Sequence, residues 1–295
     1  MLTLNPLLPI MYEPLVRTAL LEDLGRAGDI TADAIVPADQ RSALVLRARQ
    51  PGVVAGLDIA RCAFQTISPA IALRAERPDG STVAPGDIIA EIDGPARGLL
   101  TGERTALNFL CHLSGVATAT ASLVSAVKGT RAQIVCTRKT TPGLRALEKY
   151  AVRAGGGGNH RFGLDDAVLI KDNHIALAGG IRNAIERAKT HAGHLVKIEV
   201  EVDTLAQLEQ ALSLGVDAVL LDNMTVDDLK KAVGMAGGKV ITEASGRITA
   251  ATAPAIAATG VDLISVGWVT HSAAALDIGL DYLELDVRAA RGKVA

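Results

Sequence analysis

Charged and small residues stand at the ends of apolar runs throughout the second half of the chain. Six such runs cover residues 134–137, 167–170, 196–202, 218–221, 240–242 and 263–266. The residues at or just past their ends are, in order, Arg138 and Lys139, Lys171, Glu201, Asp222, Glu243 with Ser245, and Gly267. If the runs are parallel strands of a barrel, their carboxyl ends meet on one face, where barrel enzymes have their active sites. Any single strand can end in a polar residue, but five charged ends in series indicate a site.

The segment 137–171 is the most basic part of the sequence. It holds seven cations against three acids, a balance of 7 − 3 = +4 in a chain whose net charge is 30 − 32 = −2. Three of the cations follow one another at helical spacing and are expected to form a solvated or ion-pairing helix face: Arg145, Lys149 and Arg153. The other four lie at strand ends or in a loop: Arg138, Lys139, Arg161 and Lys171. A guanidinium binds a carboxylate or phosphate through two parallel hydrogen bonds, and several cations together bind a polyanion, so these four residues predict a polyanion site.

A run of four glycines, residues 155–158, precedes Asn159, His160 and Arg161. Glycine permits backbone conformations that let amide groups approach a ligand closely. The run lacks the Lys-Ser/Thr ending of a P-loop and the spacing of a dinucleotide fingerprint. A flexible linker therefore remains the alternative interpretation, and the flanking His160 and Arg161 favour a binding loop.

Acidic residues follow the basic segment. Glu199 and Glu201 share one face of their strand by its two-residue period, and Asp222 ends the next strand. Mg²⁺ prefers oxygen ligands and often binds through one or two carboxylates plus substrate phosphates. Glu201 and Asp222 are thus predicted to hold Mg²⁺; the alternative is structural pairing of these acids with Lys171 or Lys197.

The last two strands end in small residues. Ser245, Gly246 and Gly267 stand where barrel loops often hold a phosphate on backbone amides. The site predicted from the residues alone is a barrel mouth with a phosphate pocket, an acidic pair that suits a metal, and a basic patch for further anionic groups.

The composition limits the partners. A near-neutral net charge and only seven aromatic residues, 3 + 1 + 3, argue against a nucleic-acid partner. No apolar run approaches the ~20 residues of a membrane-spanning helix, so no membrane is expected. The N-terminus has no basic region before its apolar residues and does not read as a signal peptide. Three widely spaced cysteines fit a reducing compartment, which predicts a cytoplasmic protein.

The elements that position the site fall into two parts. Short apolar runs between residues 42 and 92, separated by Pro-Gly and Asp-Gly turns, predict a small sheet-containing domain. A helical stretch follows over residues 102–127, with a break near Gly115. Apolar strands then alternate with helices, which indicates a parallel sheet, and six successive units favour a barrel. Thr225 with Asp228 three residues later looks like a capping box at a helix start, and Gly215 and Gly260 like helix C-terminal glycines.

Ordered motifs along almost the whole chain resemble those of the quinolinate phosphoribosyltransferases. The motifs are GERTALNFLCHLSGVAT, TRKTTPGLRALEKYAV, GGGGNHRFGLDDAVLIKDNHI, IEVEVD, LLDNM and SVGWVTHS. The resemblance implies an α/β fold of type II phosphoribosyltransferase architecture, with an N-terminal open α/β sandwich domain and a C-terminal α/β barrel. The domains expected are residues 1–114, the sandwich; 115–270, the barrel; and 271–295, a segment returning to the N-terminal domain.

The resemblance also implies an activity and roles for residues. The family transfers the phosphoribosyl group of phosphoribosyl pyrophosphate to quinolinate, with loss of CO₂ and pyrophosphate, to give nicotinate mononucleotide for NAD synthesis. The residues implied to bind the quinolinate carboxylates are Arg104, Arg138, His160, Arg161 and Lys171. Lys139 would contact phosphoribosyl pyrophosphate, Glu201 and Asp222 would face the ribose and the Mg²⁺-pyrophosphate, and Ser245, Gly246 and Gly267 would take the 5′-phosphate. Arg104 would come from a neighbouring subunit, which implies a homodimer with a shared active site.

Three other interpretations of the sequence remain open. A family of the same fold, encoded with molybdate transport systems, tends to lack the strings that this chain keeps at residues 159–161 and 170–174. A non-catalytic anion-binding protein would use the same basic patch, and a barrel lyase would form a Schiff base on Lys171. The chain also departs from the family pattern at Ala154, where a Cys is common, and in its fourth glycine, Gly158; neither change removes a charged ligand.

Overall fold

The computed structural model describes residues 4–282, which form two compact units. Within the described residues, unit 1 comprises residues 4–119, 146–155 and 273–282, and unit 2 comprises residues 120–145 and 156–272. The predicted boundaries after residues 114 and 270 stay predictions, and most of the predicted C-terminal segment, residues 283–295, lies outside the described part of the chain.

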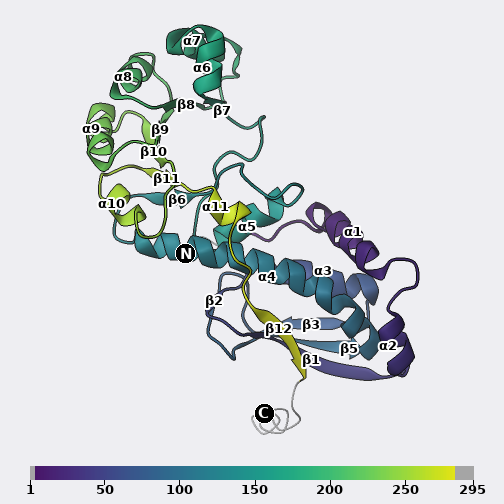
Figure 1. Cartoon of the computed structure of the whole chain (residues 1–295). Helices are drawn as coiled ribbons and strands as arrows, with labels where there is room; N and C mark the ends of the chain where they lie inside the picture. The colour runs from purple at the N-terminus through teal and green to yellow at the C-terminus, as the bar shows by residue number, and fades with distance from the viewer. Residues whose placement is uncertain (1–3, 283–295) are drawn as a thin grey trace. The chain divides into compact units, whose positions relative to one another are not determined.

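Unit 1 is built on a four-stranded antiparallel sheet of order β12-β1-β5-β3 (Figure 1). Its strands are β1 (Arg41–Ala48), β3 (Ala72–Ala75), β5 (Ile88–Pro95) and β12 (Ile278–Tyr282), with a separate pair β2 (Gly52–Val53) and β4 (Thr82–Val83). Its helices are η1 (Pro9–Met11), α1 (Glu13–Leu24), α2 (Ile30–Ile35), α3 (Leu57–Ile67), most of α4 (Ala96–Ala126) and α5 (Arg145–Ala154). The expected sheet-containing domain is confirmed.

Close packing in unit 1 depends on small residues in α4. The ring of Phe64 on α3 is fully buried, and a side chain at Gly102 would place its Cβ 2.9 Å from that ring. Helix α5 joins this unit through Tyr150, whose hydroxyl donates to Asp79 at 2.6 Å, and through Glu148, which lies 2.9 Å from the His112 ring. Lys149 of α5 is 2% exposed, so the solvated alternative is wrong at this position, while the ion-pairing alternative stays a prediction.

Helix α4 runs without interruption from Ala96 to Ala126, so the break predicted near Gly115 is wrong. Gly115 serves a close approach instead, because a Cβ there would collide with the backbone carbonyl of Ala274. By length and composition α4 could cross a membrane, which the apolar runs of the sequence did not predict, and 44% of its most apolar window is buried. Core helices of soluble proteins meet the same criterion, so this helix is weak evidence for a membrane span.

Unit 2 is a six-stranded parallel sheet of order β6-β11-β10-β9-β8-β7. Its strands are β6 (Gln133–Val135), β7 (Val168–Ile170), β8 (Ile198–Val202), β9 (Ala218–Asp222), β10 (Ile241–Ser245) and β11 (Leu263–Ser265). Each lies within a few residues of a predicted strand. Figure 1 shows helices α7 to α10 along the outer side of the strands. The helices are α6 (Asp172–Ala178), α7 (Ile181–His191), α8 (Leu205–Ser213), α9 (Val226–Ala236), α10 (Ala253–Ala257) and α11 (Trp268–His271).

Hydrogen bonds do not close this sheet into a full barrel among the described residues, since no ladder joins β6 to β7. The glycine run occupies the free edge of β6. Gly158 donates its N–H to the Ile134 carbonyl at 2.8 Å, and its own carbonyl accepts from Cys136 at 3.2 Å. A Cβ at Gly158 would lie 2.7 Å from the Gln133 side chain, so glycine suits this position.

The helix ends in unit 2 match most of the sequence signals. The Thr225 hydroxyl accepts from the Asp228 N–H at 3.2 Å and caps α9. The Asp228 carboxylate accepts from the Thr225 hydroxyl at 2.9 Å, so the reciprocal bond to the Thr225 N–H that a capping box requires is not formed. Gly215 and Gly260 have φ values of +66° and +89°, the left-handed conformation that favours glycine after a helix. These short connections hold the strand ends, and with them the site, in place.

Candidate active site

A cleft of about 410 Å³ opens at the carboxyl ends of the strands of unit 2. Nine of the residues singled out from the sequence line it: Arg138, Lys139, His160, Arg161, Lys171, Glu201, Asp222, Glu243 and Ser245. Thr137 also lines it. The strand-end prediction thus correctly identified which side chains meet in space.

A second cavity of about 380 Å³ shares part of this lining. Gly246 and Gly267 lie in it, together with Asn223 and Arg247. The residues common to both cavities are Thr137, Lys139, Asp222, Ser245 and Ser265. Two ligand groups can therefore occupy adjoining spaces with Lys139 and Asp222 between them.

The backbone of Lys139 is held on both sides. Its N–H donates to the Thr137 hydroxyl at 3.0 Å, and its carbonyl accepts from the Thr270 hydroxyl at 2.7 Å. These bonds fix the backbone while the side chain, part of an exposed residue, borders both cavities.

The loop after the glycine run is ordered by side-chain contacts. The Asp166 carboxylate accepts from the Phe162 and Gly163 N–H groups at 2.6 and 3.0 Å, and these backbone bonds lower the pKa of Asp166 despite its partial desolvation. Arg145 donates to the Phe162 carbonyl at 3.0 Å. Arg145 is a structural residue here, and these contacts favour an ordered binding loop after the glycine run over the flexible linker.

Arg138 and Arg161 face the same cleft. Both Nε atoms are buried and have no hydrogen-bond partner among the described residues. Burial, and then the positive charge of Arg138, lower the pKa of Arg161. Two half-buried guanidiniums with an unpaired donor each form an environment that favours an anion.

The acidic residues of the cleft already have partners. Glu201 Oε2 lies 3.2 Å from Lys171 Nζ, which is the structural pairing considered from the sequence, whereas Lys197 pairs with Asp217 instead. Asp222 Oδ2 accepts from the Asn223 side chain at 2.6 Å. Each carboxylate retains a further oxygen for a ligand.

At both glycines of the second cavity, neighbouring side chains approach the backbone too closely for a Cβ to fit without a shift. A Cβ at Gly267 would lie 2.9 Å from Cδ of Lys139. Gly246 has a φ of +110°, and a Cβ there would collide with the Asn223 side chain. Glycine at both positions keeps the backbone accessible, as a phosphate pocket requires.

Arg104 lies in unit 1, on α4. It lines a different cavity, of about 260 Å³, with Asp23, Asp29 and Thr101 among its neighbours. Of the predicted quinolinate ligands, the structure brings four together in one cleft and places this one in the other unit.

Glu243 is the most deeply buried acid of the cleft, with a side chain 1% exposed. Burial and the nearby charge of Glu199 raise its pKa to about 7, while His160 and Ser265 oppose the shift. The strand-end pattern included Glu243, and the two-residue strand period placed Glu199 on one face with Glu201, but neither Glu199 nor Glu243 was given a role of its own. The available signal was that alternate residues of a strand point to the same face. That pattern on β8 and β10 does not reveal that the side chains of Glu199 and Glu243 lie close together.

Replacing Glu243 with glutamine should change how stability depends on pH. The folded-state pKa lies above the ordinary 4.5, so the unfolded chain releases this proton first, and the wild-type free energy of unfolding falls as the pH rises from 4.5 through about 7. Glutamine cannot titrate. The difference in Tm, variant minus wild type, should therefore be more positive at pH 8 than at pH 4.5. The exposed Glu209→Gln serves as control, and an equal difference at both pH values would contradict the assignment.

Comparison with known proteins matches the chain in two parts, one N-terminal and one C-terminal. The family model "Quinolinate phosphoribosyl transferase, C-terminal domain" matches residues 116–281, and the corresponding N-terminal domain model matches residues 29–114. The chain belongs to the quinolinate phosphoribosyltransferase family. The expected fold is confirmed at the level of a sheet-and-helix N-terminal domain followed by a parallel-sheet α/β domain.

Individual relatives of this family match over nearly their full length. A nicotinate-nucleotide pyrophosphorylase (carboxylating) of Mycobacterium leprae is 45% identical over 90% of this chain and 95% of its own. A probable enzyme of the same name from Bacillus subtilis is 43% identical over 92% and 93%. The crystal structure of NadC from Streptococcus pyogenes superposes with a TM-score of 0.90 at 40% identity, covering 95% of this chain and all of that one.

Proposed function

We propose that this chain transfers the phosphoribosyl group of phosphoribosyl pyrophosphate to the ring nitrogen of quinolinate. The reaction releases pyrophosphate and CO₂ and gives nicotinate mononucleotide for NAD synthesis. One observation carries the proposal: Arg138, Arg161 and Lys171 converge on a cleft that also contains Glu201 and Asp222. The cations suit a dicarboxylate, and the carboxylates beside them suit a positively charged ribosyl centre.

The basic residues bind the substrate dianion in this proposal. Arg138 and Arg161 offer buried Nε donors without partners among the described residues, and Lys171 adds an ammonium. Together they hold the carboxylates and orient the ring nitrogen toward the second cavity. The same positive field stabilises the electrons left on the ring when CO₂ departs, so decarboxylation needs no base from the protein.

The second cavity takes the phosphoribosyl donor. The backbone at Gly246 and Gly267 and the Ser245 hydroxyl hold the 5′-phosphate, as the place of these residues in the lining of the second cavity supports. Lys139, between the cavities, contacts the pyrophosphate and neutralises charge that develops as it leaves. Glu201 and Asp222 face the ribose, whose anomeric carbon becomes positive.

Carboxylate oxygens are the ligand type that Mg²⁺ prefers, and Glu201 and Asp222 each keep an oxygen for one, directly or through water. We propose that these residues hold Mg²⁺ beside the pyrophosphate. When bound, the ion supplies charge neutralisation for the leaving group.

A Schiff-base lyase is disfavoured by the environment of Lys171. Its Nζ atom is paired with a carboxylate oxygen of Glu201 at 3.2 Å. A lysine nucleophile is instead activated by an apolar pocket or a neighbouring cation. Failure to trap this lysine with borohydride and a keto substrate would agree with that conclusion.

We propose further that the protein is a cytoplasmic homodimer in which Arg104 completes the partner's site. The free cysteines Cys62, Cys111 and Cys136 are compatible with a reducing compartment.

Subunit complementation tests the shared site. Arg104→Ala and Lys171→Ala chains should each be nearly inactive, whereas a 1:1 mixture refolded together should regain about a quarter of wild-type activity, because half of the dimers then hold one intact site. No recovery in a mixture proven to contain hybrid dimers would contradict the shared site.

Calorimetric titration tests the substrate assignment. Quinolinate should bind at least about tenfold more tightly than nicotinate, because its second carboxylate adds a charge-assisted interaction of about 1.5–3 kcal/mol. Equal affinities would show that the basic cleft is not built for a dicarboxylate.

A further inference from the structure

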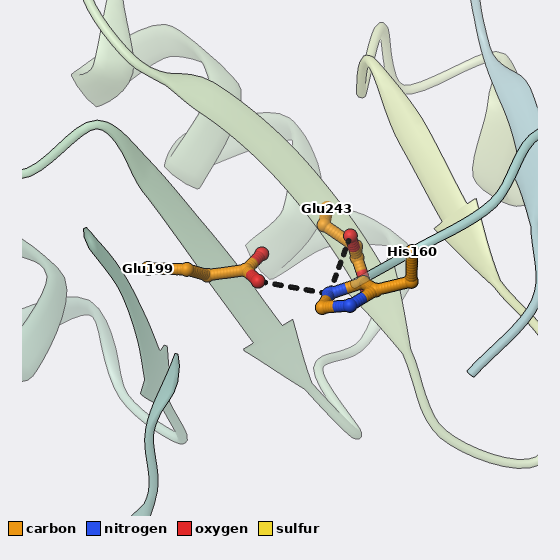
Figure 2. Close-up of side chains that lie close together, drawn as sticks. All are labelled: His160, Glu199 and Glu243. Atoms are coloured by element: carbon orange, nitrogen blue, oxygen red, sulfur yellow. Dashed lines mark hydrogen bonds and ion pairs between the residues drawn. The ribbon is translucent and has the colours of Figure 1, made fainter. Parts of the chain in front are cut away.

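His160, Glu199 and Glu243 form a compact trio at the cleft (Figure 2). His160 comes from the loop after the glycine run, Glu199 from β8 and Glu243 from β10. The His160 Nε2 atom lies 2.9 Å from Glu199 Oε2 and 3.6 Å from Glu243 Oε2. The three side chains are 14%, 12% and 1% exposed, so their protonation is set by one another and by the nearby protein groups.

The ring nitrogens of His160 have different partners. Nδ1 accepts a hydrogen bond from the backbone N–H of Arg161 at 2.8 Å. An amide N–H can only donate, so Nδ1 carries no proton. A neutral imidazole has one N–H, which is then on Nε2 and donates to Glu199. If Nδ1 were protonated as well, its N–H would point at the backbone N–H of Arg161, and neither group could accept.

The carboxylates of Glu199 and Glu243 both face His160, and a second proton in the trio would relieve their mutual repulsion. Because Nδ1 does not carry that proton, it must reside on one of the two carboxylates. Glu243 is the more buried of the two, and neither of its oxygens meets hydrogen-bond geometry with any described residue. An ionised carboxylate without donors is costly to bury, whereas a protonated one is neutral. Burial and Glu199 raise the pKa of Glu243 to about 7, in agreement with that geometry.

The same hydrogen bonds argue against a metal ion in the trio, although its ligand atoms lie within 4.8 Å of one another. A metal at Nε2 would displace the Nε2 proton to Nδ1. That atom already accepts from Arg161 N–H, so ligation would break the bond that holds the loop.

We propose that His160 is a neutral, Nε2-protonated positioning residue, anchored by Glu199 and a protonated Glu243, which fixes the backbone of Arg161 and thereby aims its guanidinium at the substrate. The proposal rests on the proposed function for the identity of that substrate. It departs from the role that the family resemblance implies for His160, because both ring nitrogens are already engaged by protein groups and leave no donor for a quinolinate carboxylate.

Nitrogen-15 NMR of the full-length protein labelled at its six histidines reads the tautomer directly. The His160 signals are assigned by their loss in His160→Gln. At pH 7 we expect Nε2 to be protonated and Nδ1 unprotonated, with no change on saturation with quinolinate or on addition of Zn²⁺. The same tautomer is expected in Glu243→Gln, since glutamine is also neutral. Protonation of both nitrogens, free or with quinolinate, or loss of the Nε2 proton with Zn²⁺, would overturn the proposal.

Kinetics separate positioning from direct binding. His160→Ala should raise the quinolinate KM about 10- to 100-fold, the value of one or two hydrogen bonds to charged groups, and leave the KM for phosphoribosyl pyrophosphate nearly unchanged. His160→Gln should recover part of the loss, because its amide can donate to Glu199. Equal losses in the two variants would indicate a charged ligand and contradict the proposal.

The exposed His191→Gln is the matched control and should behave as wild type. A wild-type protein without transferase activity would refute the proposed function, while the NMR result would still decide the state of His160.

Discussion

Lys139→Ala should lower kcat for phosphoribosyl transfer by about 10²- to 10³-fold, the usual effect of removing one preorganised charge that stabilises a transition state. The reason is its location between the two cavities, with its backbone fixed by Thr137 and Thr270. The pyrophosphate gains negative charge as its bond to the ribose breaks. An ammonium aimed at that point acts more strongly in the transition state than in the ground state, so kcat falls more than substrate affinity.

Steady-state kinetics with both substrates varied measure this effect. Lys230→Ala is the matched control, because that lysine is exposed and pairs with Asp227 on the outer helix α9. A Lys139→Ala protein with normal kcat and only a raised KM would show that the lysine binds the donor without stabilising its departure.

Arg161→Ala should raise the quinolinate KM by about 10²- to 10³-fold, since truncating one partner of a buried, hydrogen-bonded charge pair costs about 2–5 kcal/mol. Its buried Nε has no partner among the described residues, and its Nη1 is fixed by the Ala167 carbonyl at 3.0 Å. The substrate carboxylate would supply the missing acceptor.

Arg161→Lys distinguishes charge from geometry. An ammonium keeps the charge but cannot make two parallel hydrogen bonds, so this variant should recover only a small part of the lost affinity. The KM for phosphoribosyl pyrophosphate should change little in either variant. Equal losses for both substrates would place Arg161 outside the quinolinate pocket.

The strand-end pattern was enough to predict most of the cleft. Parallel strands place their carboxyl ends on one face, so Lys171, Glu201 and Asp222 were predicted to meet without knowledge of any contact, and they do. In the strand order, β8 to β11 each lie beside their predecessor in the chain, whereas β7 does not pair with β6, which pairs with β11.

Features that depend on tertiary packing could not be predicted from the strand-end pattern. Helical periodicity alone made Gly115 look like a helix breaker, but the residue permits close approach of the Ala274 backbone. Hydrogen-bonded closure of the barrel fails among the described residues because Gly158 pairs along the free edge of β6. The pairing of His160 with Glu199 and Glu243 joins a loop and two strands that are not neighbours, which no local spacing encodes.

Release of CO₂ from quinolinate labelled in the carboxylate that departs tests the central claim most directly. Wild-type protein with Mg²⁺ and phosphoribosyl pyrophosphate should release one CO₂ per pyrophosphate formed, and omission of the donor should abolish release. A folded protein that binds quinolinate but releases no CO₂ under these conditions would be an anion-binding protein, which would contradict the proposed transfer reaction.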